Sequence, residues 1–527
     1  MLSNWRCSAL VAGLLCVTSL AHADPAVQEW IKTYPWPPYT YGAMIALDPD
    51  DNVISVGHDP GASDIVTTKY DPAGNILWER HYTMEDYSLR ATWVATDGDG
   101  NVIVTGYPQT FSSNPVQTGL LTIKYDSDGA LLWDDLYSGT WAFAVRAVTD
   151  GVGNIFVTGR AWFGTYDFVT IKYAPDGSRA WLDVFDQGGG NHTPTSMDLD
   201  PSGNLLVAGG GLSGGMITTL YDASGQRQWV VERPGGAGSS VRWTNDGHFY
   251  LTGSWYTQST SNDFRLLKYD AAGALTWERF YDFGASEIGT KLALDTQENV
   301  YVTGYQSGGG YANWLTIRVD PDGNLLWSRL QDSHPAYDEF PNFLVTGPQN
   351  EVYITGSGGP SPVPGQSYIQ MLTLRYDADG TTAWVGKHYA WASRGVGVAL
   401  ASDNNVYAVG LGNSITTIKY AQSPVDVPAP TSDGVGRVTL LASEPNPFRS
   451  DVALRYSLSG TTRVRLAIFD VSGRLVANLV DGVRGHGEHR VFWDGRDARG
   501  IATPPGVYVM RLSGGSGEVS RKIVRMR

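Results

Sequence analysis

Three short patterns in the sequence contain residue types that could do chemistry. Gly211-Leu-Ser-Gly-Gly215 has the spacing of a nucleophilic serine on a tight turn, and Gly209, Gly211 and Gly214 have the spacing of a dinucleotide-binding loop. Asp97, Asp99 and Asn101 alternate as ligands do at the start of a calcium-binding loop.

Each pattern lacks the context that its chemistry needs. The two glycine patterns require a strand followed by a helix, whereas here the segment joins two expected strands. A calcium loop needs a glutamate at its twelfth position, where this chain has Pro108. The nine histidines include no His-Glu-x-x-His pair. We therefore predict no catalytic residue, no cofactor and no metal ligand.

Ten aromatic residues outside the repeated phrases are candidates for a ligand-binding surface. Aromatic rings stack on sugar rings and form the centres of protein interfaces. The alternative is that these rings cover loop edges and pack among themselves. The ten are Trp141, Phe143, Trp162, Phe163, Tyr166, Trp255, Tyr256, Tyr311, Trp314 and Trp391.

The elements that must position these rings form an internal repeat. The phrase Asn-Val-Tyr-Val-Thr-Gly and its variants begin at Asn101, Asn154 and Asn299, with weaker copies at Asn52, Asn204, His248, Glu351 and Asn405. A second phrase follows each copy and reads Thr-Ile-Lys-Tyr in its clearest versions. Each unit thus contains four short β runs, rich in Val, Ile, Thr and Tyr and ended by Gly or Asp-x-x-Gly turns.

A tryptophan marks the fourth run of every unit, and its first copy stands near the N-terminus. No such tryptophan follows Tyr420, whereas Trp30 lies 48 residues before Trp78. One ring in register in every unit most simply fills the space between neighbouring sheets, where its burial stabilises by roughly a few kcal/mol. The eight are Trp30, Trp78, Trp133, Trp181, Trp229, Trp277, Trp327 and Trp384.

A four-stranded unit of this length is typical of one blade of a β-propeller, because a sheet with two apolar faces must stack on neighbours. We therefore predict an all-β fold with an eight-bladed β-propeller over residues 24–421. The N-terminal strand completes the last blade and closes the ring by hydrogen bonds. Seven blades with an irregular end is the alternative. The Asp-x-x-Gly turns share one face of the ring, and the longer loops, which carry the ten aromatic residues, share the other.

Residues 1–23 have the organisation of a secretory signal peptide. Arg6 precedes an apolar run, and Ala21-His-Ala23 is a small-x-small cleavage site. Both cysteines, Cys7 and Cys16, lie in this segment, so the mature chain cannot form disulfides. No later run is long and apolar enough for a transmembrane segment. We expect a protein that is secreted or held at the outer cell surface after cleavage near Ala23.

Charge and composition divide the remaining chain. Residues 437–527 carry 15 Lys and Arg against 8 Asp and Glu, although the whole chain has a net charge of −15. The acidic body disfavours nucleic acid as a partner. Residues 422–436 contain three prolines among Ser, Thr and Asp, which is typical of a linker. After them, the alternation Val452, Leu454, Tyr456 predicts a small immunoglobulin-like β-sandwich over residues 437–527.

The repeats and the C-terminal segment resemble known bacterial families. The blade phrases are similar to those of the SBBP β-propeller repeat family. Residues 440–527 resemble the flagellar hook-cap immunoglobulin-like domain and the related type IX secretion type A sorting domain, which implies passage to the cell surface by a secretion machinery. The matching segments are Pro445-Asn-Pro-Phe448, Ile468-Phe-Asp-Val-Ser-Gly-Arg474, Trp493-Asp-Gly-Arg-Asp-Ala-Arg-Gly500, Pro505-Gly-Val-Tyr508 and Lys522-Ile-Val-Arg525.

Together these features predict an exported β-propeller that acts as a binding module for a glycan or a protein. The C-terminal domain would direct secretion or attachment. A propeller enzyme that acts on extracellular polysaccharide and a structural spacer without a ligand are the alternatives.

Overall fold

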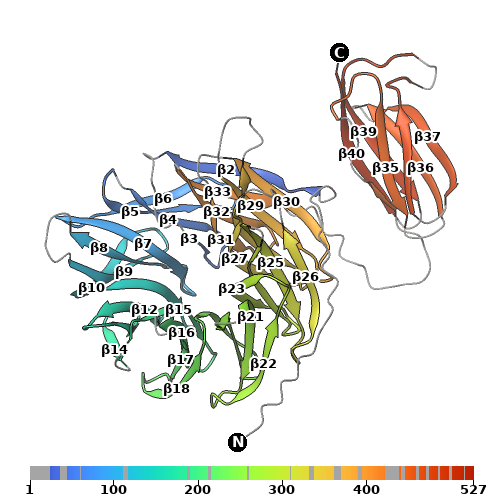
Figure 1. Ribbon diagram of the computed structural model, residues 1–527. Helices are drawn as coiled ribbons and strands as arrows, with labels where there is room; N and C mark the ends of the chain where they lie inside the picture. The colour runs from blue at the N-terminus through green and yellow to red at the C-terminus, as the bar shows by residue number, and fades with distance from the viewer. Residues whose placement is uncertain are drawn as a thin grey trace, which may run out of the picture. The chain divides into compact units, whose positions relative to one another are not determined.

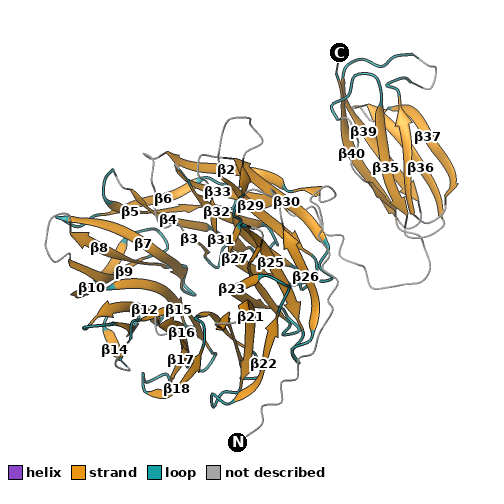
Figure 2. Cartoon of the chain, viewed as in Figure 1, coloured by secondary structure: helices purple, strands orange, loops and turns teal. Residues whose placement is uncertain are grey.

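The fold is that of a computed structural model, and the chain divides into two compact units, Met1–Pro424 and Val425–Arg527. The predicted signal peptide and the predicted linker lie outside the described residues. None of the described residues forms a helix that could span a membrane, and both units are built of strands (Figure 2). The structure describes residues 24–35, 44–59, 61–110, 117–186, 190–211, 215–257, 260–308, 310–331, 337–360, 369–389, 394–412, 414–421, 438–440, 446–458, 462–470, 474–484, 487–497, 501–514 and 517–526.

Eight antiparallel sheets form a ring in the first unit (Figure 1), so the predicted eight-bladed propeller is confirmed. Four consecutive strands make each of blades 1 to 7. Blades 1 to 3 are β3 (Met44–Leu47), β4 (Val53–Asp59), β5 (Asp64–Tyr70), β6 (Ile76–Tyr82); β7 (Tyr87–Thr96), β8 (Val102–Thr110), β9 (Gln117–Tyr125), β10 (Leu131–Thr140); and β11 (Phe143–Thr149), β12 (Ile155–Trp162), β13 (Tyr166–Tyr173), β14 (Arg179–Phe185).

The later blades repeat this order of strands. Blades 4 and 5 are β15 (His192–Leu199), β16 (Leu205–Gly211), β17 (Gly215–Tyr221), β18 (Arg227–Pro234); and β19 (Gly238–Trp243), β20 (Phe249–Thr257), β21 (Thr260–Tyr269), β22 (Leu275–Tyr281). Blades 6 and 7 are β23 (Ser286–Leu294), β24 (Val300–Gly308), β25 (Tyr311–Val319), β26 (Leu325–Gln331); and β27 (Phe340–Thr346), β28 (Val352–Pro360), β29 (Ile369–Tyr376), β30 (Thr382–Tyr389).

Blade 8 is completed from the N-terminus, as the sequence predicts. It contains β31 (Arg394–Leu400), β32 (Val406–Leu411) and β33 (Ser414–Ala421), and its outer strand is β2 (Val27–Pro35), which pairs antiparallel with β33. A feature that the sequence does not indicate lies just before β2. The short strand β1 (Asp24–Pro25) pairs in parallel with β30 of blade 7, so the N-terminal segment binds two blades.

Apolar side chains fill the space between every pair of neighbouring blades. Eight buried hydrophobic clusters each join the residues of two adjacent sheets. The cluster between blades 8 and 1 contains Tyr407 and Val409 from one sheet and Ile45 and Val53 from the other, with Trp30 packed against it. The last blade therefore packs on the first, and the ring is closed.

The repeated tryptophan links each blade to the next, at the outer strand. The indole Nε1 of Trp78 donates a hydrogen bond to the carbonyl of Ser127, in the turn between β9 and β10, at 3.0 Å. The Lys69 ammonium donates to the same carbonyl at 2.9 Å. The Trp78 ring also lies against Gly129 of that turn, where an added Cβ would come within 2.7 Å of it. The prediction that these rings lie between neighbouring sheets is confirmed.

The same link recurs around the ring. An indole donates to the second residue of the following turn in Trp30–Pro72, Trp133–Pro175, Trp229–Ala271, Trp277–Pro321 and Trp327–Ala378, with distances from 3.0 to 3.2 Å. Trp181 of blade 3 and Trp384 of blade 7 are exceptions, because neither indole Nε1 has a hydrogen-bond partner among the described residues. Trp384 faces blade 8, whose outer strand is β2 from the N-terminus. Blade 8 therefore has no turn between its third and fourth strands that could accept the hydrogen bond.

The Asp-x-x-Gly turns are held by their own aspartates. The Asp97 carboxylate accepts from the backbone N of Asp99 and Asn101 and from the Asn101 side chain, and it pairs with the buried Lys124 ammonium at 3.0 Å. Asp48 makes the same set of contacts, with Lys69 at 2.7 Å. These contacts support a turn-capping role for these aspartates and not a calcium loop at Asp97.

The second unit is a β-sandwich of seven strands. One sheet is β34 (Val438–Leu440), β35 (Val452–Leu458) and β38 (Gly487–Trp493); the other is β37 (Leu475–Arg484), β36 (Thr462–Asp470), β39 (Gly506–Gly514) and β40 (Gly517–Arg525). The side chains of Tyr456, Leu466, Trp493 and Met510 belong to its core. The predicted immunoglobulin-like sandwich is confirmed.

The contact between the tryptophan ring and the turn glycine can be tested with Gly129→Ala. Gly129 and Gly247 have the same left-handed φ, +82° and +83°, but nothing lies within 4 Å of a Cβ at Gly247. Ala at either position should cost about 1–2 kcal/mol of backbone strain. Gly129→Ala should cost a further ~1–3 kcal/mol from the clash with Trp78. Equal unfolding midpoints in urea for the two variants would show that the contact contributes nothing.

Candidate functional site in the central channel

The first strand of each blade lines the centre of the ring, and aromatic rings fill one side of it. Trp93 of β7 and Phe343 of β27 have ring centroids 5.9 Å apart. Trp93 belongs to blade 2 and Phe343 to blade 7, and blades 8 and 1 lie between these two blades in the ring. The Arg146 guanidinium of β11 lies 4.3 Å from the centre of the Trp93 ring. These three side chains occupy the channel next to blades 8 and 1.

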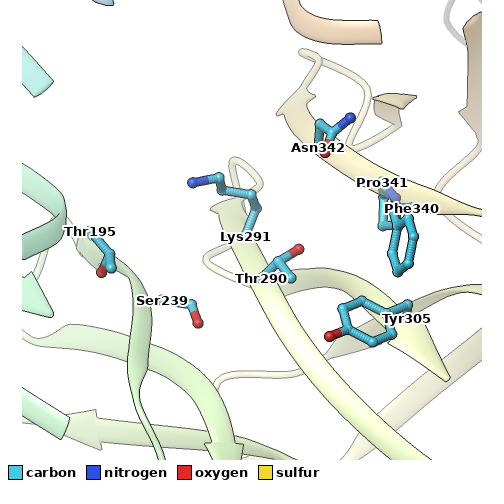
Figure 3. A pocket seen from close by; sticks show the side chains of 8 residues that line it. All are labelled: Thr195, Ser239, Thr290, Lys291, Tyr305, Phe340, Pro341 and Asn342. Atoms are coloured by element: carbon cyan, nitrogen blue, oxygen red, sulfur yellow. The ribbon is translucent and has the colours of Figure 1, made fainter. Parts of the chain in front are cut away.

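The channel is open on the side of blades 4 to 7. A cavity of about 470 Å³ lies there, within the ~300–1,000 Å³ that small-molecule sites occupy. Figure 3 shows the Lys291 side chain extending into this space. The cavity is lined by Thr195 of β15, Ser239 of β19, Thr290 and Lys291 of β23, Tyr305 of β24, and Phe340, Pro341 and Asn342 of β27.

Three basic side chains from three different blades act on one another across the channel. Burial, together with the charges of Arg146 and Arg242, lowers the pKa of Lys291 to about 8. Burial and Arg242 lower the pKa of Arg146 to about 9, with Asp198 opposing them. Blades 3, 5 and 6 are not all neighbours, so charges on them can interact in this way only through the channel.

The positive charge of this group exceeds what the nearby carboxylate can balance. Asp198 is the acidic group that acts on Arg146, and its Oδ2 already accepts the backbone N–H of Trp243 at 2.7 Å. Arg146 is only 7% exposed, and its Nε has no hydrogen-bond partner in the part of the chain that the structure describes. A buried surplus of positive charge favours a negatively charged occupant.

The neutral side chains of the cavity mostly offer acceptors. Thr195 donates its hydroxyl hydrogen to the backbone, with the Gly238 carbonyl at 2.8 Å, and Thr290 donates to the Thr303 carbonyl at 3.1 Å. The Asn342 amide donates to the Gly395 carbonyl at 2.7 Å. The oxygens of these side chains are left to accept hydrogen bonds from a ligand. Tyr305 and Phe340 add an edge-to-face aromatic pair with centroids 5.0 Å apart.

The aromatic residues singled out in the sequence lie elsewhere. Phe143 and Tyr166 of blade 3 flank the Arg160 guanidinium, at 5.2 and 4.6 Å from their ring centres, and Trp162 packs edge-on against Tyr166. Trp141, between the last strand of blade 2 and the first strand of blade 3, and Phe163, between β12 and β13, are exposed. The role of these five residues in binding stays a prediction.

The other five predicted residues belong to other parts of the chain. Trp255 packs against Phe280 and the Arg265 guanidinium in blade 5, and Tyr311 is exposed at the start of β25. Trp391 and the side chain of Tyr256 lie outside the described residues. Trp314 needs a correction. It is 1% exposed, and its Nε1 donates to the Ser357 carbonyl at 2.8 Å, so it belongs to the core between blades 6 and 7 and cannot serve as a ligand platform.

The sequence analysis missed the channel site, although one signal for it was present. Arg146 and Lys291 each stand four residues before the aspartate of the first turn, Asp150 and Asp295. When this position is compared between the repeats, it is basic in two of them. The other residues of these first β runs are mostly apolar or small. Recognition of the site also required knowing that first strands line the channel.

The C-terminal unit and the propeller were compared with known proteins. Residues 449–518 match the family model of the FlgD Ig-like domain. A curated relative, the uncharacterized WD repeat-containing protein L264 of Acanthamoeba polyphaga mimivirus, is 22% identical over 460 residues, which cover 67% of this chain and 31% of that protein. The chain thus spans about a third of the length of that relative.

Solved propellers are similar to the first unit at low identity. The Dos1 propeller has a TM-score of 0.46 and 10% identity, with 74% of this chain and 95% of that chain covered. The β-propeller domain of the Trilobed protease from Pyrococcus furiosus has a TM-score of 0.38 and 8% identity, with 63% and 95% covered. The class of the protein is thus a β-propeller joined to an FlgD Ig-like domain.

The burial of Lys291 predicts a pH-dependent contribution to stability. The pKa of Lys291 falls from 10.5 to about 8 in the folded protein, so between these values the unfolded chain binds more protons and stability rises with pH. Lys291→Met should be more stable than the parent at pH 7, and this advantage should shrink as the pH rises from 8 to 10. Urea unfolding midpoints of both proteins across this range measure it. A difference that stays constant with pH would contradict the burial of a charged Lys291.

Proposed function

We propose that this protein is an exported binding module that holds a hydroxylated organic acid, such as an acidic sugar, in the channel of its propeller. The observation that carries the proposal is that Lys291 lines the cavity and that the charges of Arg146 and Arg242 act on it from two other blades. The cations would bind the carboxylate. Ligand hydroxyls would donate to the oxygens of Thr195, Thr290 and Asn342, while Tyr305 and Phe340 offer an apolar wall.

The long-loop face would contribute to the same activity. Phe340 begins β27, directly after one of the longer loops, so the cavity lies on the side of the channel that the exposed aromatic residues also border. An acidic glycan could place one unit in the channel and further units on rings such as Trp162. This extends the predicted glycan-binding surface from the loops to the channel.

Export and surface attachment are the second part of the proposal. They are supported by the signal-like segment at residues 1–23, the lack of cysteine after it, and the FlgD Ig-like match at residues 449–518. The similarity of residues 440–527 to type IX sorting domains supports a role in secretion, and the blade phrases support SBBP-type repeats.

Ligand binding can be tested by isothermal titration with glucuronate, with glucose as the neutral control of the same shape. At pH 7 glucuronate should bind and glucose should not. Lys291→Met should weaken binding about tenfold or more, because a hydrogen bond to a charged group contributes about 1.5–3 kcal/mol. Lys522→Met, which removes an exposed lysine of the C-terminal unit, is the matched control and should bind as the parent does. Equal binding of glucose, or unchanged binding by Lys291→Met, would contradict the proposal.

Export can be tested in a host with a type IX system by comparing the full chain with a variant that lacks residues 437–527. The full chain should reach the cell surface or the medium, and the shortened chain should stay in the periplasm. Equal amounts of both proteins outside the cell would contradict a sorting role for the C-terminal unit.

A further inference from the structure

One aspartate position recurs in three blades on the long-loop side of the ring. Asp64, Asp167 and Asp263 each stand six residues before the tyrosine that ends the third strand. In blade 1 the His81 Nδ1 lies 2.6 Å from Asp64, and the His192 Nδ1 of blade 4 lies 3.7 Å from Asp167 of blade 3. Each of these two carboxylates therefore faces a histidine that can balance its charge.

Asp263 of blade 5 faces two more carboxylates instead. One oxygen each from Asp263, Asp282 and Glu287 lie within 4.8 Å of one another. Burial and Asp282 raise the pKa of Asp263, and burial raises that of Glu287 to about 7. The charged side chain that acts on both groups is Asp282, whose negative charge has the same sign as theirs.

Glu287 brings a buried carboxylate oxygen, without a hydrogen-bond partner among the described residues, into this cluster. The residue is fully buried, and its Oε1 accepts from the Gln306 side chain at 2.9 Å and from the backbone N of Ala285 at 3.1 Å. Its Oε2 is also enclosed, and no described residue forms a hydrogen bond with it. A buried carboxylate oxygen without a partner is costly unless a cation coordinates it or a proton neutralises it.

The repeat contains a second set of residues at positions equivalent to those of the cluster. Asp186 and Asp282 each stand five residues after the tryptophan of their blade, and His192 and Glu287 each stand eight residues before the aspartate of the next first turn. Two sets of residues therefore occupy equivalent positions: Asp167, Asp186 and His192, and Asp263, Asp282 and Glu287. The two sets differ in one residue type, because the first has a histidine where the second has a glutamate. With three oxygen donors and no nitrogen or sulfur, the second set suits a hard divalent cation.

We propose that Asp263, Asp282 and Glu287 bind a calcium ion between blades 5 and 6. The three carboxylates would supply up to six oxygens, which matches the six to eight that calcium takes. Asp263 lies in the third strand of blade 5, Asp282 directly follows its fourth strand, and Glu287 lies in the first strand of blade 6. The ion would thus join two neighbouring sheets and stabilise their contact.

Calorimetric titration of the EDTA-treated protein with calcium chloride at pH 7.5 tests the proposal. One ion should bind per chain, and the melting temperature should rise with calcium. Glu287→Gln and Asp282→Asn should weaken binding by more than about tenfold and abolish the shift in melting temperature. Asp282 is exposed, so Asp282→Asn remains informative if substitution of the buried Glu287 disturbs folding.

Asp167→Asn is the matched control, because it alters the equivalent position in the set that contains His192. It should bind calcium as the parent does. No heat and no thermal shift with calcium would overturn the proposal, and so would binding of manganese or magnesium in place of calcium. Undiminished calcium binding by both cluster variants would overturn it as well. A gain in stability of Glu287→Gln without any calcium effect would show that the carboxylates share a proton, which also overturns it.

Discussion

The antiparallel pairing of β2 with β33 is the interaction on which the ring depends. A propeller blade exposes apolar surface on both faces, so an open row of eight blades would leave two faces and one strand edge in water. Residues 24–527 contain no cysteine with which to link the ends of the ring. The N-terminal segment instead supplies the outer strand of blade 8, and β1 continues the pairing onto blade 7. The channel forms, and the basic side chains of Arg146, Arg242 and Lys291 come together in it, only because this ring is closed.

A second, smaller interaction sets the spacing between blades. The indole and the lysine of one blade donate to a single carbonyl in the turn of the next, and a glycine in that turn leaves room for the ring. Because these donors and the acceptor recur in register, each blade fixes the position of its neighbour. First strands are then free to vary at the channel, where blades 3, 5 and 6 carry Arg146, Arg242 and Lys291.

The architecture could be predicted from the sequence because the residues that form each blade recur at regular intervals along the chain. The repeated tryptophan at Trp30 revealed both the number of blades and the manner of closure. The channel site could not be found in the same way, because Arg146, Arg242 and Lys291 are far apart in the chain and meet only once the ring forms. Trp314 was misjudged for a related reason: its place near a loop did not show that its ring turns into the space between blades 6 and 7. The acidic cluster was not recognised from the spacing of metal ligands in the sequence, because its members come from separate segments of two blades.

The central claim is that the N-terminal strand closes the ring, and amide hydrogen exchange in β33 tests it most directly. The full protein should be compared with a variant that lacks residues 24–35 and with a control that lacks only residues 24–26. Loss of β2 should expose the edge of β33. The β33 amides that form hydrogen bonds to β2 should then lose their protection from exchange, and the melting temperature should fall. The control should keep both properties close to those of the parent. Protected β33 amides and an unchanged melting temperature in the longer deletion would contradict the account.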